Sequence, residues 1–364
     1  MRIIEWAFPY FPSIGGRERF VERITKDLRK RQLDVLLIAQ KPIDQPRYQE
    51  SFPEVDLRIA PAWELADPGS PMRSEQWERL SNAIGNSADS VLHIHRLEGV
   101  DVLLIKRIRE TWAMPVVMTL HNPLLAPIES SEVDEERFAL VDLFVAISPF
   151  VMSQTLKVYP NLWDRLTLIP NSVPLGKSSN QPGEGFLFMG RLSQEKGVLQ
   201  LISAFHFLNQ LHPDTKLTIA GDGDQLKLLQ NAVSSLGLTK AVVFTGWLED
   251  EALSQYISKC RAVVVPTVNQ EPFGLVAAEA MSHGKPLIYA VSGALPWIAE
   301  DGVAGLSFAP GDIVALVHQM RQLHLNADLA RSLGEAGHQI VQTRFRTEDM
   351  IDAYIQAFKG LLNA

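Results

Sequence analysis

The sequence predicts an α/β protein with two doubly wound parallel sheets. Short apolar runs rich in β-branched residues recur along all 364 residues, and segments with helical spacing lie between them. Strands and helices that alternate in this way form βα units and a parallel sheet. Most of the runs are continuously hydrophobic, as is typical of parallel strands buried on both faces. The length corresponds to about two domains, and the series of runs is too long for a single sheet.

The N-terminal domain is predicted over residues 1–172. Its first strand leads into a segment with clear helical spacing, Gly16–Arg31, as expected of a βα unit. The strands of this domain are expected at Arg2–Phe8, Asp34–Ala39, Ser90–Ile94, Pro115–His121, Val141–Ser148 and Leu166–Pro170. The stretch LGKSSNQPGE at residues 175–184 is polar and contains Gly and Pro, which predicts a linker over residues 173–184.

The C-terminal domain is predicted over residues 185–345 and repeats the same alternation. Its strands are expected at Gly185–Gly190, Lys216–Gly221, Ala241–Gly246, Ala262–Thr267, Pro286–Ala290 and Gly305–Pro310. Helical spacing is found at Val198–Leu211, Asp224–Leu236 and Glu249–Lys259. Two more helical stretches follow Pro310, and a last helix, Glu348–Leu362, is expected within the C-terminal segment 346–364.

Composition excludes several classes of protein. Lys and Arg number 34 against 42 Asp and Glu, for a formal net charge of −8, which argues against binding to a nucleic-acid backbone. The single cysteine, Cys260, excludes an intrachain disulfide framework and a thiolate zinc cluster. No apolar run reaches about 18 residues, and the N-terminus lacks the features of a signal peptide. We therefore expect a cytoplasmic protein.

Ligands of open α/β sheets bind beyond the carboxyl ends of the strands, so the loops after the strands are the first places to search. The first strand is followed by Gly15 and Gly16 at the start of a helix, where backbone amides can approach an anion closely; an ordinary tight turn is the alternative. Arg191 and Lys196 lie in GRLSQEKG, after the first strand of the second domain. Two cations held there suit a diphosphate, although they could also be solvated surface charges.

The most informative stretch is PTVNQEPFGLVAAEAMSHGKP, residues 266–286. Glu271 lies in a loop, and Gly274 and Leu275 are expected to present free amides at a helix start, which favours an anion. Glu279 lies inside that helix, where its carboxylate could accept hydrogen bonds from two vicinal hydroxyls. Glu271 could do the same from the loop, or it could be only an acidic residue near a helix start. A carboxylate among apolar helix residues, as at Glu279, needs a partner.

These stretches together resemble the GT-B glycosyltransferases of family 4, a large group of retaining enzymes that use nucleotide sugars. EPFGLVAAE looks like the E-x7-E motif of that family, GRLSQEKG resembles its phosphate loop, and GDGD at 221–224 is similar to its G-x-G turn. HGKPLIYAVSGALPWI at 283–298 resembles a further segment of the donor domain. PSIGGRERFVERITKDLRKRQLDV at 12–35 resembles the family's glycine loop and first helix, and TLHN at 119–122 its strand-end histidine. The similarity covers nearly the whole chain in the expected order.

The resemblance implies a GT-B fold, in which two Rossmann-like domains face a cleft and the last helix crosses back to the N-terminal domain. It implies that Arg191 and Lys196 hold the diphosphate of the donor, with Gly15 and Gly16 in support. The amides of Gly274–Leu275 would bind phosphate or sugar hydroxyls.

The resemblance also implies roles at the sugar and the nucleoside. Glu271 would bind hydroxyls of the transferred sugar, and Glu279 those of the ribose. His121 would lie close to the donor sugar at the reaction centre. Together with Glu271, Arg191 and Lys196 it would form the set of catalytic groups. Without the motif order, a lone strand-end histidine would be interpreted as a hydrogen-bonded core residue.

Some positions depart from the family pattern. Ser172 stands where a glycine is frequent, and Asn122 replaces a common acidic residue after the histidine. Glu300 follows an apolar pair that an acidic residue more often precedes, so no role is assigned to it. His93 and His95 lie at another strand end and could face the cleft; no acidic cluster accompanies them, which disfavours a metal site.

The implied function is transfer of a hexose from a nucleotide diphosphate sugar to a sugar, lipid-linked or small-molecule acceptor, with retention of configuration. Another GT-B activity, such as a nucleotide-sugar epimerase or an inverting transferase, is an alternative, as is a catalytically silent nucleotide-sugar-binding subunit. No metal cofactor is expected, because Arg191 and Lys196 supply the positive charge and no DxD-type acidic pair ends a strand.

The segment Arg17–Arg31 holds seven basic and three acidic residues, a local charge of +4. A basic helix of this kind could dock on anionic lipid at the inner face of a membrane, in keeping with a lipid-linked acceptor. A solvated helix face with internal salt bridges is the alternative.

Overall fold

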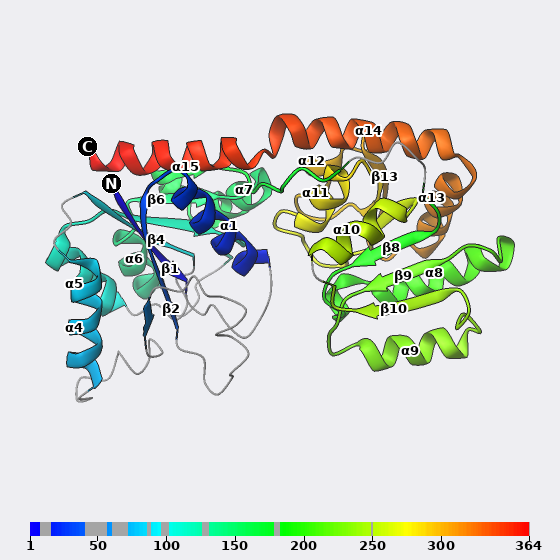
Figure 1. Ribbon diagram of the computed structural model, residues 1–364, viewed down its shortest axis with the longest axis horizontal. Helices are drawn as coiled ribbons and strands as arrows, with labels where there is room; N and C mark the ends of the chain where they lie inside the picture. The colour runs from blue at the N-terminus through cyan, green and yellow to red at the C-terminus, as the bar shows by residue number, and fades with distance from the viewer. Residues whose placement is uncertain are drawn as a thin grey trace. The chain divides into compact units, whose positions relative to one another are not determined.

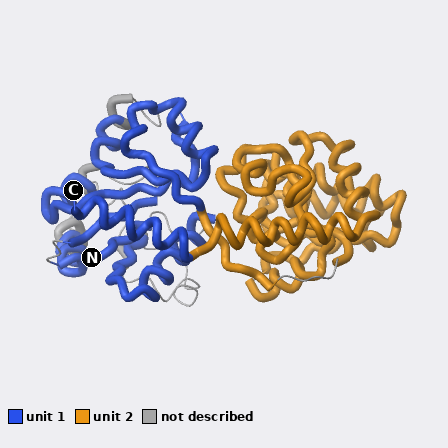
Figure 2. The backbone as a smooth tube through the Cα atoms, turned by 90° about the horizontal axis from the view of Figure 1, so that it is seen from above, with its two compact units in different colours: residues 1–170, 348–364 blue, residues 171–347 orange. Residues whose placement is uncertain are grey.

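The computed structural model describes residues 1–7, 16–40, 57–59, 72–85, 89–95, 102–125, 131–177, 183–248 and 250–363. The chain forms two compact units (Figure 2). Unit 1 comprises Met1–Pro170 together with Glu348–Ala364, and unit 2 comprises Asn171–Thr347. Both ends of the chain therefore lie in unit 1 (Figure 1).

Unit 1 is built on a parallel sheet that has seven strands among the described residues, in the order β3-β2-β1-β4-β5-β6-β7. The strands are β1 (Arg2–Ala7), β2 (Asp34–Gln40), β3 (Leu57–Ile59), β4 (Ser90–Ile94), β5 (Val116–Leu120), β6 (Leu143–Ala146) and β7 (Leu166–Leu168). The order confirms a doubly wound sheet, because the chain builds outward from β1 in one direction and then from β4 in the other.

The helices of unit 1 are α1 (Gly16–Lys30), α4 (Met72–Ile84), α5 (Val102–Trp112), α6 (Ser131–Ala139), α7 (Pro149–Val158), the 3₁₀ helix η1 (Pro160–Arg165) and α15 (Thr347–Leu362). Helices α1 and α15 cover one face of the sheet (Figure 1). Side chains alternate between the two faces of a strand, so Ile3 and Ala7 of β1 reach the same core as Phe358 of α15.

Unit 2 contains a second parallel sheet, with the order β10-β9-β8-β11-β12-β13. The strands are β8 (Phe186–Met189), β9 (Leu217–Ala220), β10 (Val242–Gly246), β11 (Ala262–Val265), β12 (Leu287–Ala290) and β13 (Gly305–Phe308). The helical elements are η2 (Gln194–Lys196), α8 (Val198–Leu211), α9 (Leu226–Ser235), α10 (Asp250–Lys259), α11 (Leu275–Ser282), α12 (Leu295–Ala299), α13 (Ile313–Leu325) and α14 (Ala327–Arg344).

Every run that the sequence predicts as a strand forms one, and β3 is an addition. Because β3 is only three residues long and pairs with the end of β2, its sequence carries too little pattern to be recognised as a strand.

The division between the units falls after Pro170, earlier than the linker expected at 173–184. Residues 171–177 belong to unit 2, where the Val173 amide donates to the Phe345 carbonyl at 3.2 Å. Among the described helices, none is both long and apolar enough to cross a membrane.

Candidate active site

The sheet of unit 2 reverses its direction of winding between β8 and β11, which are neighbours. In open α/β sheets, ligands bind at this switch point, beyond the carboxyl ends of the strands. The loop after β8 carries Arg191 and Lys196, and the loop after β11 carries Glu271. Topology therefore brings these three residues, which lie far apart in the sequence, to one edge of one sheet.

Lys196 and Glu271 are in direct contact. The ammonium Nζ of Lys196 donates to Oε2 of Glu271 at 2.8 Å. The side chains remain 29% and 19% exposed, respectively, so a ligand can still reach both. Arg191 is exposed at the beginning of the same loop as Lys196. The site thus offers a cation, a carboxylate and a further cation at the switch point.

Backbone hydrogen bonds hold the Glu271 loop against its neighbours. The amide of Val268 and the hydroxyl of Thr267 both donate to the Glu195 carbonyl, at 2.9 and 3.0 Å. On the other side, the amide of Ala294 donates to the Glu271 carbonyl at 2.8 Å. Gly293 has φ 56°, and a Cβ there would overlap the backbone of Glu271. The position of Glu271 therefore depends on the loops after β8 and β12.

Helix α11 starts where the sequence predicts. Gly274 is its N-cap in the left-handed conformation, with φ 99°, and Leu275 is its first residue. No side chain caps this end, which leaves backbone amides available to an anion. Phe273 is buried in edge-to-face contact with Phe345, which anchors the helix start. Glu279 lies within α11 and is partly buried.

The GDGD turn after β9 completes this edge of the sheet. The amide of Gly190 donates to the Ala220 carbonyl at 2.9 Å, and the amide of Leu192 to the Asp222 carbonyl at 2.8 Å. A Cβ at Gly221 would overlap the carbonyl oxygen of Gly190. The glycine thus allows the turn to support the loop that carries Arg191 and Lys196.

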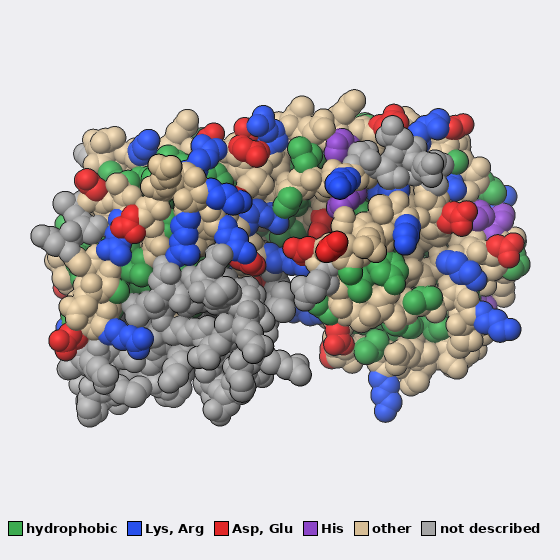
Figure 3. Space-filling view, viewed as in Figure 1, with side chains coloured by type: hydrophobic (Ala, Val, Ile, Leu, Met, Phe, Trp, Pro, Cys, Tyr) green, Lys and Arg blue, Asp and Glu red, His purple; other side chains and the backbone are tan. Residues whose placement is uncertain are grey.

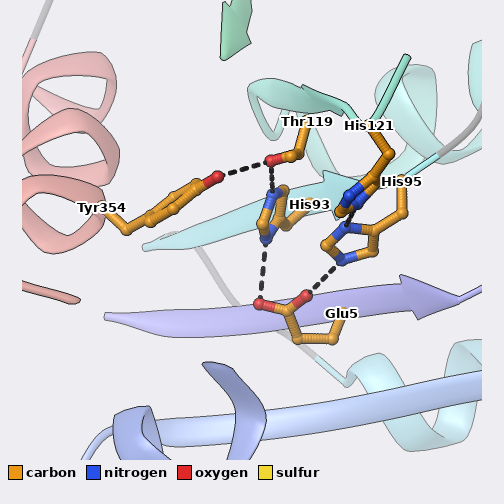
Figure 4. Close-up of polar contacts among 6 residues, drawn as sticks. All are labelled: Glu5, His93, His95, Thr119, His121 and Tyr354. Carbon is orange, nitrogen blue, oxygen red and sulfur yellow. Dashed lines mark hydrogen bonds and ion pairs between the residues drawn. The ribbon is translucent and has the colours of Figure 1, made fainter. Parts of the chain in front are cut away.

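Unit 1 contains a second polar cluster, buried beneath α1 and α15 (Figure 4). Glu5 lies in β1 and is fully buried. Its Oε1 lies 3.0 Å from Nδ1 of His93, and its Oε2 lies 2.8 Å from Nε2 of His95. Glu5 and His93 are directly paired in the register of β1 and β4, and the spacing of two residues places both histidines on the same face of the strand.

The cluster extends on both sides of the two histidines. Nε2 of His93 lies 2.8 Å from the hydroxyl of Thr119, which is 2.8 Å from the hydroxyl of Tyr354 in α15. Nδ1 of His95 lies 3.3 Å from Nε2 of His121. His121 follows β5 and is only partly buried, so solvent reaches this member of the hydrogen-bonded cluster. We call these six residues the carboxylate–histidine network (Figure 4).

Burial and neighbouring groups shift the pKa values of Glu5, His95 and His121 in this network. Burial alone raises the pKa of Glu5, but the electrostatic effect of His93 and the hydrogen bonds from both histidines lower that pKa to about 2. Burial and repulsion from His93 lower the pKa of His95 to about 4, although Glu5 opposes this. Burial, followed by His95 and Arg17, lowers the pKa of His121 well below its usual value. At neutral pH, Glu5 is therefore an anion, and His95 and His121 are neutral.

The surroundings of His93 and His95 differ from the sequence expectation in two respects: the burial of His93 and the presence of a carboxylate beside both rings. His93 lies inside β4 and is fully buried, instead of facing a cleft from the strand end. Glu5, His93 and His95 are close enough together to hold a metal ion, their ligand atoms lying within 4.8 Å of one another. The carboxylate oxygens of Glu5 and the ring nitrogens of His93 and His95 make hydrogen bonds to one another and to Thr119 and His121.

Sequence reasoning missed Glu5, Thr119 and Tyr354. A signal for Glu5 was present, because a carboxylate inside the apolar strand RIIEWA requires buried donors. Tyr354 gave no such signal, since it lies more than 200 residues away, on the last helix.

Gly16 begins α1, whereas Gly15 lies outside the described residues.

Helix α1 carries acidic partners for several of its cations. Lys26 pairs with Glu22 and Lys30 with Asp27, each at 2.7 Å. Arg31 pairs with Asp352 of α15, also at 2.7 Å. Figure 3 shows basic side chains gathered over α1, with carboxylates among them. Glu22 and Asp27 are already included in the local charge of +4, so only the pair with Asp352 lowers the charge that this segment presents to an anionic surface.

Comparison with known proteins shows the family of the chain. The family model described as Glycosyltransferase Family 4 matches residues 14–177, and the model described as Glycosyl transferases group 1 matches residues 177–340. Glycogen synthase of Mycobacterium tuberculosis is 32% identical over 98% of this chain and 94% of its own length. The chain belongs to the group 1 glycosyltransferases of family 4. It is a glycosyltransferase.

Solved structures show the same fold for this glycosyltransferase. Sucrose-phosphate synthase from Thermosynechococcus elongatus superimposes with a TM-score of 0.75 at 21% identity, over 100% of this chain and 99% of that one. HepE of Anabaena, solved in complex with UDP-glucose, gives a TM-score of 0.76 at 20% identity, over 99% and 100% of the two chains. The predicted GT-B fold is thereby confirmed.

The family models cover the two sites unequally. Lys196, Glu271 and the start of α11 fall within the group 1 match. His93, His95 and His121 fall within the family 4 match, but Glu5 and Tyr354 lie outside both matched ranges. The carboxylate–histidine network of this glycosyltransferase is thus completed by residues beyond the matched segments.

Proposed function

We propose that this glycosyltransferase moves a hexose from a nucleotide diphosphate sugar to an acceptor hydroxyl, with retention of the anomeric configuration. The observation that carries the proposal is the Lys196–Glu271 pair at the switch point of the unit 2 sheet, beside Arg191 and the uncapped start of α11. Cations and helix amides suit a diphosphate, and a carboxylate suits sugar hydroxyls. The similar structure of HepE with UDP-glucose supports this class of donor.

Bond cleavage would place negative charge on the departing diphosphate. Lys196 and Arg191 would stabilise that charge, and the amides at Gly274 and Leu275 would add positively polarised N–H groups. Glu271 would hold hydroxyls of the moving sugar, and Glu279 those of the ribose. In this scheme catalysis comes from positioning and electrostatic stabilisation, without a protein nucleophile.

The donor class can be tested with a panel of UDP-, GDP-, ADP- and dTDP-sugars, read by mass spectrometry. Transfer or slow hydrolysis of one of them is expected, and NMR of the product anomer should show the α-configuration of the donor. A product with inverted configuration would establish an inverting transferase, and interconverted sugar nucleotides an epimerase. Tight donor binding without turnover on any acceptor or water would indicate a silent binding subunit.

We propose further that turnover needs no divalent metal, since Arg191 and Lys196 provide the positive charge at the diphosphate. Activity should persist after EDTA treatment and gel filtration. Complete loss of activity with recovery on addition of Mn²⁺ or Mg²⁺ would contradict this part of the proposal.

The acceptor is proposed to be a sugar, a lipid-linked glycan or a small molecule. Contact of α1 with anionic lipid would accompany a lipid-linked acceptor. The pair of Arg31 with Asp352 lowers the local charge of +4 by one, so flotation with anionic vesicles should be weak and should disappear at physiological salt. Binding that persists at high salt would point to a stronger membrane surface elsewhere on the protein.

A further inference from the structure

The carboxylate–histidine network determines where its hydrogens lie. Both oxygens of Glu5 face ring nitrogens, and an ionised carboxylate only accepts hydrogen bonds. His93 must therefore donate from Nδ1 and His95 from Nε2. These donors also explain how a fully buried carboxylate is tolerated, because burying an ion without hydrogen-bond partners is costly.

The hydrogen on Nε2 of His95 has a consequence for His121. A neutral imidazole carries one N–H, so Nδ1 of His95 has a lone pair. The hydrogen bond between Nδ1 of His95 and Nε2 of His121, at 3.3 Å, then requires His121 to donate. Because His121 is also neutral, its only hydrogen is on Nε2, and its Nδ1 carries a lone pair.

Packing holds the two rings in this arrangement. Phe20 of α1 meets the ring of His121 edge-on at a centroid distance of 5.0 Å, and that of His95 at 5.6 Å. Thr119 and Tyr354 occupy the far side, where they engage His93. Arg17 of α1 is the nearby cation, and it disfavours a second positive charge on His95 or His121.

We propose that Glu5 and His95 are positioning residues that hold His121 in the Nε2–H tautomer, so that Nδ1 of His121 accepts a hydrogen bond from a hydroxyl of the bound substrate. This inference rests on the proposed function and on the family resemblance, which implies that His121 lies close to the donor sugar. It adds that His121 acts as a hydrogen-bond acceptor. The buried carboxylate of Glu5, linked to His121 through His95, determines which nitrogen of His121 is the acceptor.

The tautomer can be measured without any substrate. In ¹⁵N-histidine-labelled protein, long-range ¹H–¹⁵N correlation spectra distinguish the two neutral tautomers, and His121→Phe assigns the signals of His121. The Nε2–H form is expected in the wild type. A divalent ion bound by Glu5, His93 and His95 would take the lone pair of His95 Nε2, move its hydrogen to Nδ1 and force the Nδ1–H form on His121. The Nδ1–H form, with or without bound metal by elemental analysis, would overturn the proposal.

Activity gives a second measurement through a matched pair of variants. In His95→Asn, the amide oxygen lies near the former Nδ1 and can still accept from His121. In His95→Gln, the amide lies near the former Nε2 and keeps only the contact with Glu5. We expect His95→Gln to lower kcat roughly tenfold, the scale of one lost hydrogen bond, with a smaller change in donor KM. His95→Asn should lower kcat less, because an acceptor for His121 remains although Glu5 no longer orients it.

Equal losses of kcat in the two variants, at matched thermal stability, would mean that His95 only fills space, and the proposal would fail. Should either variant not fold, the spectrum of the wild type still decides the tautomer. If no donor is turned over by the wild type, the proposed function fails, whereas the spectrum continues to report separately on the tautomer of His121.

Discussion

At the residue scale, the side chains of the proposed donor site have distinct surroundings. Lys196 is held by Glu271 at 2.8 Å, whereas Arg191 is exposed and Glu279 lies within α11. A side chain near the breaking bond contributes more to the transition state than to ground-state binding, and a remote one contributes about equally to both. This difference allows the assigned roles to be separated by kinetics.

Lys196→Ala is expected to lower kcat by roughly two orders of magnitude or more, because negative charge on the diphosphate grows as the glycosidic bond breaks. Glu279→Gln should instead raise the KM for the donor, with a smaller loss of kcat, since ribose hydroxyls are remote from the reaction. Steady-state kinetics with a fixed acceptor would measure both. The reverse pattern would show that the two roles are exchanged.

Glu271→Gln should separate nucleotide binding from transfer. The carboxylate of Glu271 offsets the charge of Lys196 in the free enzyme, so its neutralisation should tighten binding of the free nucleoside diphosphate several-fold, or about 1 kcal/mol. Transfer should slow, because the sugar loses a hydrogen-bond acceptor. Calorimetric titration with UDP and GDP gives the affinity. Asp328→Asn, which removes an exposed ion pair with Arg331 elsewhere in unit 2, is the control; equal effects would indicate a general change in charge.

At the scale of elements, loops that follow strands form the proposed donor site. The loop after β11 lies between the loop after β8, bound through the Glu195 carbonyl, and the loop after β12, bound through the amide of Ala294. The approach of Gly293 to the backbone of Glu271 is closer than any residue with a Cβ allows. The position of the partly buried Glu271 carboxylate therefore depends on contacts made by backbone atoms.

Gly293→Ala should displace the Glu271 loop and reduce transfer by at least tenfold, the scale of a lost or misplaced hydrogen bond. Gly302→Ala is a matched control, because Gly302 also has positive φ, 74°, but open space beside its Cα. Both variants should lose about 1 kcal/mol of stability from backbone strain, and Gly293→Ala should lose more because its Cβ also overlaps the backbone of Glu271; urea unfolding measures both losses. Normal activity of Gly293→Ala would show that the loop does not depend on this approach.

At the scale of the whole molecule, the chain returns to unit 1 after completing unit 2. Helix α15 adds Tyr354 and Phe358 to the core on one face of the unit 1 sheet, and Tyr354 binds the network through Thr119. The network lies among the buried side chains of that core, so its protonation affects the stability of unit 1 as well as the site.

Unit 1 should lose stability on acidification from about pH 6.5. His95 has a pKa of about 4 in the folded state against 6.5 ordinarily, so only the unfolded chain takes up this proton as the pH falls from 6.5 to 4. Glu5, with a pKa of about 2 against 4.5, extends the loss below pH 4.5. Proton uptake by His95 in the unfolded chain lowers the free energy of unfolding by about 3 kcal/mol at pH 4.

Urea unfolding at pH 7 and at pH 4.5 would measure this effect, with His95→Asn for comparison. The variant lacks the buried imidazole, so its stability should fall less over the same interval. An identical fall in both proteins would show that other groups cause the acid sensitivity.

Local sequence patterns were enough to predict the alternation of strands and helices, the division into two sheets and the loops that carry Arg191, Lys196, Glu271 and Gly274. They were enough because buried parallel strands are read from local apolar runs, and strand ends of a doubly wound sheet gather at one edge. Only the tertiary structure decided that Lys196 meets Glu271 and that Glu5, His95 and His121 form one hydrogen-bonded chain beside Tyr354. Such contacts depend on side-chain directions and on register between distant segments, which no local pattern specifies.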